Sequence, residues 1–195
     1  MKQKTPFILA IFITATITLS AINPHQVDVY IAEIIPVVII FLIFVSTYKK
    51  FQFSNTAYIL CSIWIVLHTI GAHYTFANVP FGFITELFNF ERNHFDRVAH
   101  FSIGLFAYAI AEFVYKKRYT NFFTSIFLAL STIMAIACAY EIIEWIFAIV
   151  QDNEVGLEFL GSQGDIWDAQ KDMFADTLGA ITALVLFYKN YQKTS

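Results

Sequence analysis

Six long apolar runs, separated by short polar stretches, make up most of the chain. They cover approximately residues 7–22, 29–48, 57–76, 97–115, 122–150 and 173–188. A helix needs about 20 residues to cross the hydrocarbon core of a bilayer, and it satisfies its own backbone groups where lipid offers no partner. The pattern therefore predicts an all-α fold, a polytopic membrane bundle of about six transmembrane helices that forms one domain over residues 1–195.

The composition supports a membrane protein and excludes other classes. Hydrophobic residues make up 58% of the chain and charged residues 14%, whereas charged residues are about a quarter of a soluble domain. The net charge is only -3, and no basic run is long enough to indicate nucleic-acid binding. We therefore expect membrane lipids, and no nucleic acid, as partners.

The first apolar run also has features of a secretory signal. It has a basic start, an apolar middle and small residues near its end. However, Leu19 between Thr18 and Ser20 makes a poor cleavage site, and the apolar stretch is longer than usual for a signal. We expect a retained helix, with a cleaved signal as the alternative.

The lysines and arginines predict the orientation of the bundle. Cytoplasmic loops carry an excess of these residues. Nine of them fall on the side that holds both termini: Lys2, Lys4, Lys49, Lys50, Lys116, Lys117, Arg118, Lys189 and Lys193. Only Arg92, Arg97 and Lys171 lie in or beside the opposite loops. This distribution puts both termini in the cytoplasm and the loops 23–28, 77–96 and 151–172 outside.

In this topology, ionisable residues from four helices reach a similar depth near the outer face. These candidate site residues are His73, Asp96, His100, Glu141, Glu144, Asp172 and Asp176, with His68, Arg97, Asp165 and Asp168 as secondary candidates. Asp96 and His100 are spaced i,i+4 and share one helix face. His68 and His73 are five residues apart, about 140° around a helix, so they are not expected to serve one site. We favour His73 because its depth matches that of the other candidates.

Charged groups inside a membrane are costly and usually functional, and gathered carboxylates need a cation, shared protons or basic partners. Histidine and carboxylate ligands on facing helices are how helical bundles hold metals. The sequence therefore predicts a polar site that could hold a divalent metal. Three simpler interpretations stay open: Asp96 as a helix cap, His100 as a satisfied interior histidine, and Asp172 as a solvated first-turn charge. Glu33 and Glu112 each stand alone near a segment end, where a charged head can reach the interface.

The outer stretch GLEFLGSQGDIWDAQKD leads into the last helix. Gly161 and Gly164 permit tight backbone turns, and Asp165 and Asp168 follow them. An acidic loop over an acidic site could act as a lid or as part of a ligand pocket. An ordinary helix–helix connection is the alternative.

Three motifs carry a resemblance to a known family: RNHFDRVAHFSIGLFAY, YEIIEW and GSQGDIWDAQKDMFADTLGA. They resemble the YjdF family of bacterial inner-membrane proteins, a family of unknown function, which implies the inner (cytoplasmic) membrane as the location. More loosely, they are similar to VanZ-like proteins, which are linked to glycopeptide-antibiotic resistance. Residues Asp96, Arg97 and His100 match the VanZ-like Asp-Lys-x-x-His start of a helix, and Glu141 or Glu144 matches its acidic middle helix. Asp172, Asp176 and Gly179 match its last helix, although Asp176 stands where Asn is usual.

Three functions are compatible with these features. The first is a membrane protein with an outer-leaflet site, possible metal dependence and a lipid or lipid-linked substrate. The second is a small proton- or cation-coupled transporter. The third is an accessory protein whose polar cluster only fixes helix packing. We expect the first, since the sequence shows no internal repeat or paired broken helices of the usual transporter kind.

Overall fold

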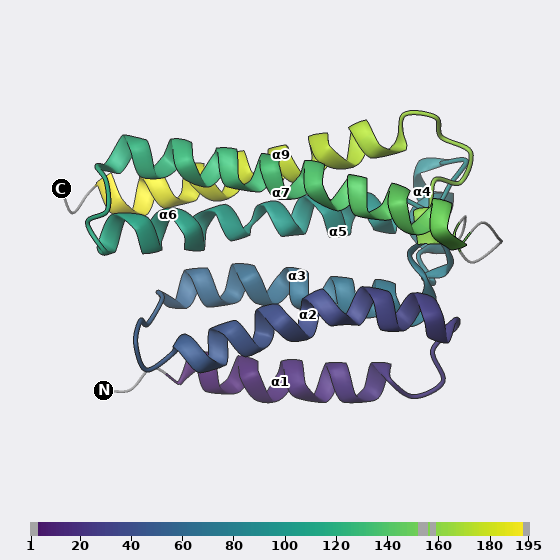
Figure 1. Ribbon diagram of the computed structural model, residues 1–195, viewed down its shortest axis with the longest axis horizontal. Coiled ribbons are helices and arrows are strands. Elements are labelled where there is room, and N and C mark those ends of the chain that lie inside the picture. The colour runs from purple at the N-terminus through teal and green to yellow at the C-terminus, as the bar shows by residue number, and fades with distance from the viewer. Residues whose placement is uncertain (1–3, 152–155, 157–158, 193–195) are drawn as a thin grey trace.

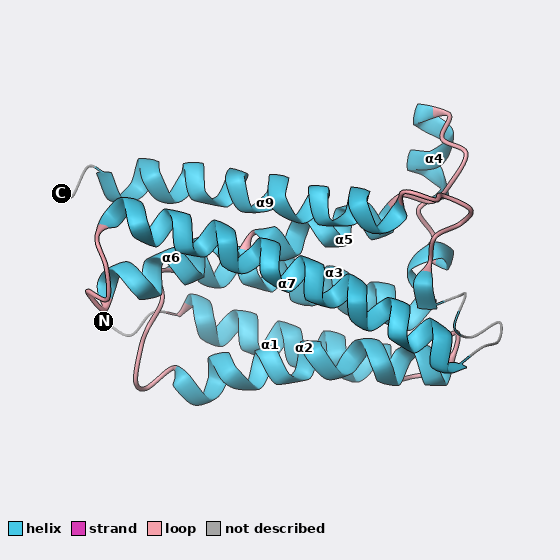
Figure 2. Cartoon of the chain, turned by 45° about the horizontal axis from the view of Figure 1, so that its top comes forward, coloured by secondary structure: helices cyan, strands magenta, loops and turns pink. Residues whose placement is uncertain are grey.

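The structure, a computed structural model, describes residues 4–151, 156 and 159–192, and this part of the chain contains no strand (Figure 2). Its helices are α1 (Thr5–Ser20), α2 (Val27–Thr47), α3 (Asn55–Tyr74), the 3-10 helix η1 (Phe76–Asn78), α4 (Gly82–Phe88), α5 (Phe95–Gly104), α6 (Phe106–Lys116), α7 (Phe122–Gln151) and α9 (Asp168–Tyr191). The all-α prediction is confirmed. Each predicted run corresponds to one of the long helices, with α5 and α6 together forming the fourth.

Four helical stretches are long and apolar enough to cross a membrane: Val27–Thr47, Asn55–Tyr74, Phe95–Lys116 and Phe122–Val150. Helix α1 is apolar but shorter, and α9 is long but carries three buried aspartates in its first half. These helices run side by side along the long axis (Figure 1). The arrangement is that of a polytopic helical bundle, as the apolar pattern predicts.

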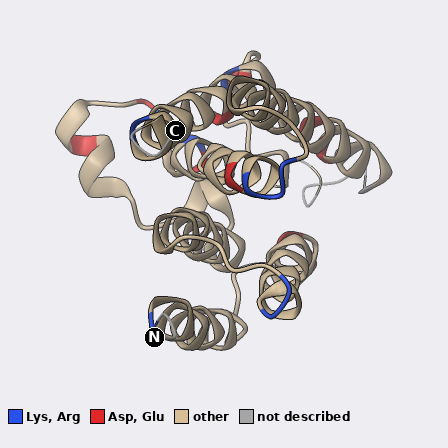
Figure 3. Ribbon diagram, turned by 90° about the vertical axis from the view of Figure 1, so that its left-hand side faces the viewer, with Lys and Arg blue, Asp and Glu red and all other residues tan. Residues whose placement is uncertain are grey.

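Both ends of the described chain lie at the same end of the bundle (Figure 1). The turns at this end carry lysine and arginine, as Figure 3 shows from that side. This agrees with the predicted topology, although Lys2 and Lys193 lie outside the described residues. The opposite end holds the α1–α2 turn, the α3–α5 connection and the α7–α9 connection. After the predicted orientation, we call this end the outer end and the end with both termini the cytoplasmic end.

The helices form two groups, with α1, α2 and α3 in one and α5, α6, α7 and α9 in the other (Figures 1 and 3). Helix α3 joins the groups because it packs against α5 and α6. The larger buried core lies towards the cytoplasmic end and includes Leu105, Ala107, Ala180, Leu184 and Phe187. Most of the lipid-facing surface is made of large exposed aliphatic and aromatic side chains.

Helices α5 and α9 cross with their backbones in direct contact. A methyl group added at Gly104 would collide with the backbone of Asp176 and Ala180, and one added at Gly179 would collide with the backbone of Phe101. Small residues let membrane helices approach until their backbones touch. The predicted run 97–115 is broken next to this crossing, at Leu105, into α5 and α6. The crossing brings the aspartates of α9 against the first half of α5.

A buried carboxylate closes the cytoplasmic end. Glu112 is fully buried, accepts hydrogen bonds from the backbone amide and the hydroxyl of Ser54, both at 2.8 Å, and pairs with Lys116. Ser54 is also the N-cap of α3 and accepts from the amide of Ala57. The prediction that Glu112 extends towards the interface is therefore wrong, because its partners are supplied inside the protein.

Candidate functional site

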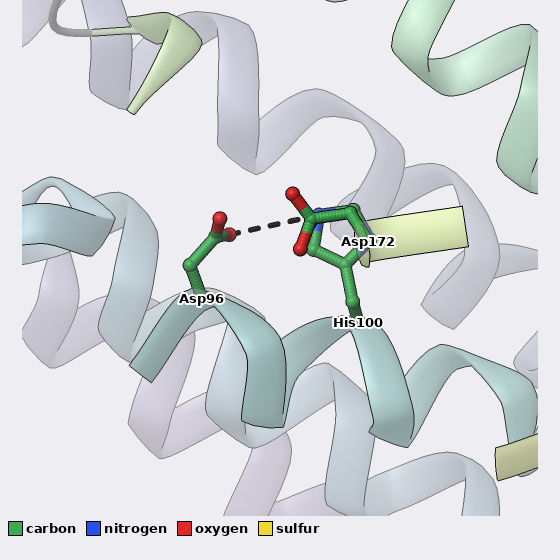
Figure 4. A group of neighbouring side chains, drawn as sticks. All are labelled: Asp96, His100 and Asp172. Atoms are coloured by element: carbon green, nitrogen blue, oxygen red, sulfur yellow. Dashed lines mark ion pairs between the residues drawn. The ribbon is translucent and has the colours of Figure 1, made fainter. Parts of the chain in front are cut away.

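His100 on α5 lies at the centre of a buried polar cluster at the outer end. Its Nδ1 atom is 3.3 Å from both carboxylate oxygens of Asp176 on α9. Its Nε2 atom faces the other way, 3.6 Å from Asp96 Oδ1 and 3.8 Å from Asp172 Oδ1. Figure 4 shows Asp96 and His100 one turn apart on their helix, with Asp172 beside the imidazole ring. The i,i+4 spacing predicted this shared face.

The two sides of the imidazole ring have different partners, and this difference has a chemical consequence. A carboxylate that accepts the Nδ1–H proton fixes the tautomer and leaves the Nε2 lone pair free to act as a ligand. Asp176 is placed to accept that proton, and Nε2 then points between two further carboxylates. The arrangement is the carboxylate–histidine pair that commonly orients a metal ligand.

Asp96, His100 and Asp172 form the most compact set of potential ligands in the described part of the chain. One donor atom from each lies within 4.8 Å of the others, and all three residues are buried. Carboxylate oxygen and imidazole nitrogen suit divalent ions such as manganese, iron or zinc. The simpler interpretations of Asp96 and Asp172 do not hold, since α5 has His94 at its N-cap without a side-chain cap hydrogen bond, and Asp172 is buried rather than solvated.

A layer of alternating charges covers this cluster on the outer side. Arg97 pairs with Asp172 below it and with Asp168 above it. Arg92 Nη1 lies 2.6 Å from the same oxygen of Asp168. Lys171 Nζ lies 2.6 Å from Asp165, and the hydrogen bond it donates lowers the pKa of that carboxyl group. Asp165 and Asp168 thus belong to an outer ion-pair layer rather than to the ligand set.

A second polar group lies beside the cluster and joins the two groups of helices. His68 Nε2 on α3 is 2.9 Å from Glu33 Oε2 on α2, and the hydroxyl of Tyr140 on α7 donates to the same oxygen at 2.7 Å. Glu33 is buried, so the prediction that it extends to the interface is wrong. Sequence reasoning missed Glu33 and Tyr140, although a glutamate and a histidine within apolar helices were signals that could have paired them.

The structure reverses the preference between the two histidines of α3. His68 is buried among Trp64, Phe76 and Tyr140 and faces the polar cluster. His73 instead places Nδ1 at 2.8 Å from the carbonyl oxygen of Ser20, at the end of α1. Depth along the helix favoured His73, but the rotation about the helix axis directs His68, and not His73, towards α5 and α7.

A small cavity of about 50 Å³ connects the two polar groups. Apolar residues such as Trp64, Phe76 and Ala99 form most of its wall, and six polar side chains from α3, α5, α7 and α9 also line it: His68, Asp96, His100, Tyr140, Glu144 and Asp176. This volume holds an ion with a few water molecules and is too small for a lipid. Ile136, which is about half exposed on the lipid-facing surface, also lines the cavity, so the space lies close to the bilayer.

The two glutamates of α7 approach the cluster from the opposite side. Glu144 is buried and lines the cavity. Glu141 interacts electrostatically with His100 and Asp172, and its Oε1 atom is buried without a hydrogen-bond partner among the described residues. The inner part of the site therefore holds more carboxylates than it has arginines and histidines to balance them.

Two comparisons with known proteins agree with these observations. A family model described as "Predicted membrane protein (DUF2238)" matches residues 5–193. The chain is also similar to the inner membrane protein YjdF of Escherichia coli (strain K12), with 32% identity over 179 residues, 90% of this chain and 85% of that protein. No solved structure matches. Neither match tests the looser similarity to VanZ-like proteins, which stays a prediction.

Proposed function

The chain belongs to the family of membrane proteins described as DUF2238, and from this premise we propose that its outer-end cluster is a divalent-metal site for a lipid or lipid-linked substrate. Asp96, His100 and Asp172 would hold the ion. We further propose the inner (cytoplasmic) membrane as its location, since the similar Escherichia coli protein is named for that membrane. A bound divalent ion could polarise a phosphoryl or acyl oxygen of the substrate.

The observation that carries this proposal is the two-sided environment of His100. Asp176 lies on Nδ1, and Asp96 and Asp172 lie on Nε2, at distances that leave room for a cation between them. The Asp172 oxygen that faces His100 Nε2, Oδ1, also pairs with Arg97 Nη1, so an ion held by this oxygen would share it with the guanidinium group that orients the carboxylate. Carboxylates gathered in excess of their basic partners favour a bound cation, because the cation supplies the missing positive charge.

The size and depth of the site favour a substrate that stays in the bilayer. The cavity accommodates an ion and water but not an acyl chain. The outer ends of α5 and α9 place the ligands close to the headgroup region. A lipid could therefore present its polar head to the site from the membrane while its chains stay outside the protein.

The interior between the two ends argues against a transporter path. A cluster of buried apolar residues that includes Leu105, Ala107, Ala180 and Ala183 lies between the outer site and Glu112. Proton or cation transfer across the membrane needs polar groups along the way. The transporter alternative would therefore require a large rearrangement of this core.

The direct test is the metal content of protein purified in mild detergent without chelator, measured by mass spectrometry. We expect near-stoichiometric divalent metal in the wild type and loss of it in His100→Ala and Asp172→Asn. His73→Ala and Asp28→Asn are the matched controls, since His73 contacts Ser20 and Asp28 is exposed. Wild-type protein that is folded yet free of metal, and stays so after incubation with manganese or zinc, would refute the metal site.

A further inference from the structure

All the lysines and arginines at the outer end of the described chain converge on one place. Arg92 Nη1 and Arg97 both contact Asp168 Oδ1, and they lie 3.6 Å and 3.5 Å from Asp165 Oδ2. Lys171 contacts the same oxygen of Asp165. Figure 1 shows the connection that leads into α9 at the outer end of the bundle. The three cations could have been spread along the membrane surface, but they meet directly above the metal-ligand candidates.

The two arginines are held as buried donors and not as loose surface charges. Their side chains are only 10% and 15% exposed. Arg92 also donates to the carbonyl oxygens of Ser162 and Gly161, at 3.1 Å and 3.4 Å. Its Nε atom, however, is buried without a hydrogen-bond partner among the described residues. A guanidinium group that is fixed in this way and has an unused N–H can donate a further hydrogen bond to an acceptor on a ligand.

Asp168 is an incomplete partner for this pair of arginines. A single carboxylate oxygen accepts from both guanidinium groups. A phosphate group offers three acceptor oxygens and up to two negative charges, and arginine binds it through paired parallel hydrogen bonds. A phosphate in place of the Asp168 carboxylate could therefore offer a separate oxygen to each of the two guanidinium groups.

Arg97 connects this anion site to the proposed metal site. One of its terminal nitrogens pairs with Asp168 and the other with Asp172. An anion that binds to Arg92 and Arg97 would therefore lie beside the ligands Asp96 and Asp172. Two arginines next to a divalent ion are a combination that favours a phosphoryl group over a carboxylic ester, because they match its charge.

We propose that Arg92 and Arg97 bind the phosphate group of the substrate, and that Asp168 occupies this place when no substrate is bound. The proposal deepens the proposed function by naming the substrate class. It treats the loop 161–168 as a built-in competitor, which a phosphate-bearing headgroup displaces. Asp165 and Lys171 then hold the loop at its edge.

The test uses detergent-purified full-length protein and native mass spectrometry. The probes are dioctanoyl phosphatidic acid, inorganic phosphate, and octanoate as a carboxylate control. We expect Asp168→Asn to bind phosphatidic acid about threefold or more tightly, since a competing carboxylate is neutralised, and Arg92→Gln or Arg97→Gln to bind it about tenfold more weakly. Lys189→Gln, which removes a charge at the cytoplasmic end, should leave the affinity unchanged.

Each outcome has a defined meaning. An affinity that Asp168→Asn leaves unchanged or lowers would overturn the proposal, as would equal losses in Arg92→Gln and Lys189→Gln, or equal binding of octanoate. If Arg92→Gln fails to fold, Arg92→Lys is used instead. Lysine keeps the positive charge but lacks the paired donors of a guanidinium group, so this variant should lose part of the affinity. Binding of phosphatidic acid but not of phosphate would identify the lipid as the source of the group.

The same experiment separates this proposal from the metal site. Phosphatidic acid is added before and after chelator treatment, and metal content is measured on Arg92→Gln. Binding that persists after chelation supports the arginine site even if no metal is present. If Arg92→Gln keeps its metal but loses lipid binding, the metal site does not depend on Arg92. The failure of one proposal is therefore distinguishable from the failure of the other.

Discussion

Both ends of the bundle bury carboxylates, but the two ends give them different hydrogen-bond donors and cations. At the cytoplasmic end, Glu112 has two hydrogen bonds from Ser54 and one cation, Lys116. At the outer end, His100 stands among several carboxylates with one arginine as the nearest permanent cation. A buried charge whose partners are all inside the protein is expected to hold helices together, whereas a group of carboxylates in excess of its basic partners needs a cation or shared protons. The comparison teaches that charge balance, and not burial, distinguishes the two roles.

The largest effect is expected from separating α5 and α9. Gly179→Val would place a side chain against the backbone of Phe101, so the helices must move apart. We expect the protein to lose about 3 kcal/mol or more of its free energy of unfolding and to lose bound metal, since overpacking distorts both the crossing and the site. Unfolding in mixed detergent–SDS micelles and metal content provide the measurements. Gly82→Val, at a glycine with open space around it, is the control.

A change at Glu112 should affect stability alone. Glu112→Ala leaves the Ser54 amide and hydroxyl without their acceptor, and Lys116 without its partner. We expect a loss of about 2–4 kcal/mol in the free energy of unfolding, because a buried network is broken on one side. Metal content per folded protein should stay at the wild-type value. A parallel loss of metal would mean that the two ends are not independent and that the comparison fails.

A change at Asp176 should lower metal affinity and leave stability nearly unchanged. Asp176→Asn keeps the shape of the side chain but weakens the acceptor that orients His100. We expect metal affinity to fall by about 10- to 100-fold, the usual cost of removing an outer-shell carboxylate. Stability should change little, since one charge is removed from a crowded acidic group. Competition with a fluorescent chelator measures the affinity, and an unchanged value would show that Asp176 does not orient the ligand.

The sequence predicts contacts within one helix well and contacts between helices poorly, and the reason is periodicity. The i,i+4 spacing of Asp96 and His100 placed these two residues on a shared face before any tertiary contact was known. The partners of Glu112 and Glu33 come from other helices, Ser54 on one side and His68 with Tyr140 on the other. Local spacing carries no information about such pairs.

The exact helix ends and the close approach of α5 to α9 also could not be predicted from local sequence patterns. Each apolar run correctly located a helix, but the helices begin earlier, as at Thr5 and Asp168, because polar first turns are invisible to an apolar pattern. Gly104 or Gly179 alone did not predict the close crossing of α5 and α9, since a small residue indicates such a crossing only when the residue that faces it is known. The choice between His68 and His73 depended on neighbours in the same way.

The smallest expected effect tests whether the Glu33 group belongs to the structural or the functional kind. Tyr140→Phe removes one neutral donor to Glu33, and His68→Ala removes the other partner. We expect Tyr140→Phe to cost about 1 kcal/mol of unfolding free energy, and a double-mutant cycle of Tyr140→Phe with Glu33→Gln to give a coupling of similar size. If the group only joins the two sets of helices, metal content and phosphatidic acid binding will stay unchanged in both variants. A loss of metal or of lipid binding at constant stability would instead place Glu33, His68 and Tyr140 in the same functional unit as His100. The cavity supports this alternative, because His68 and Tyr140 line it together with His100.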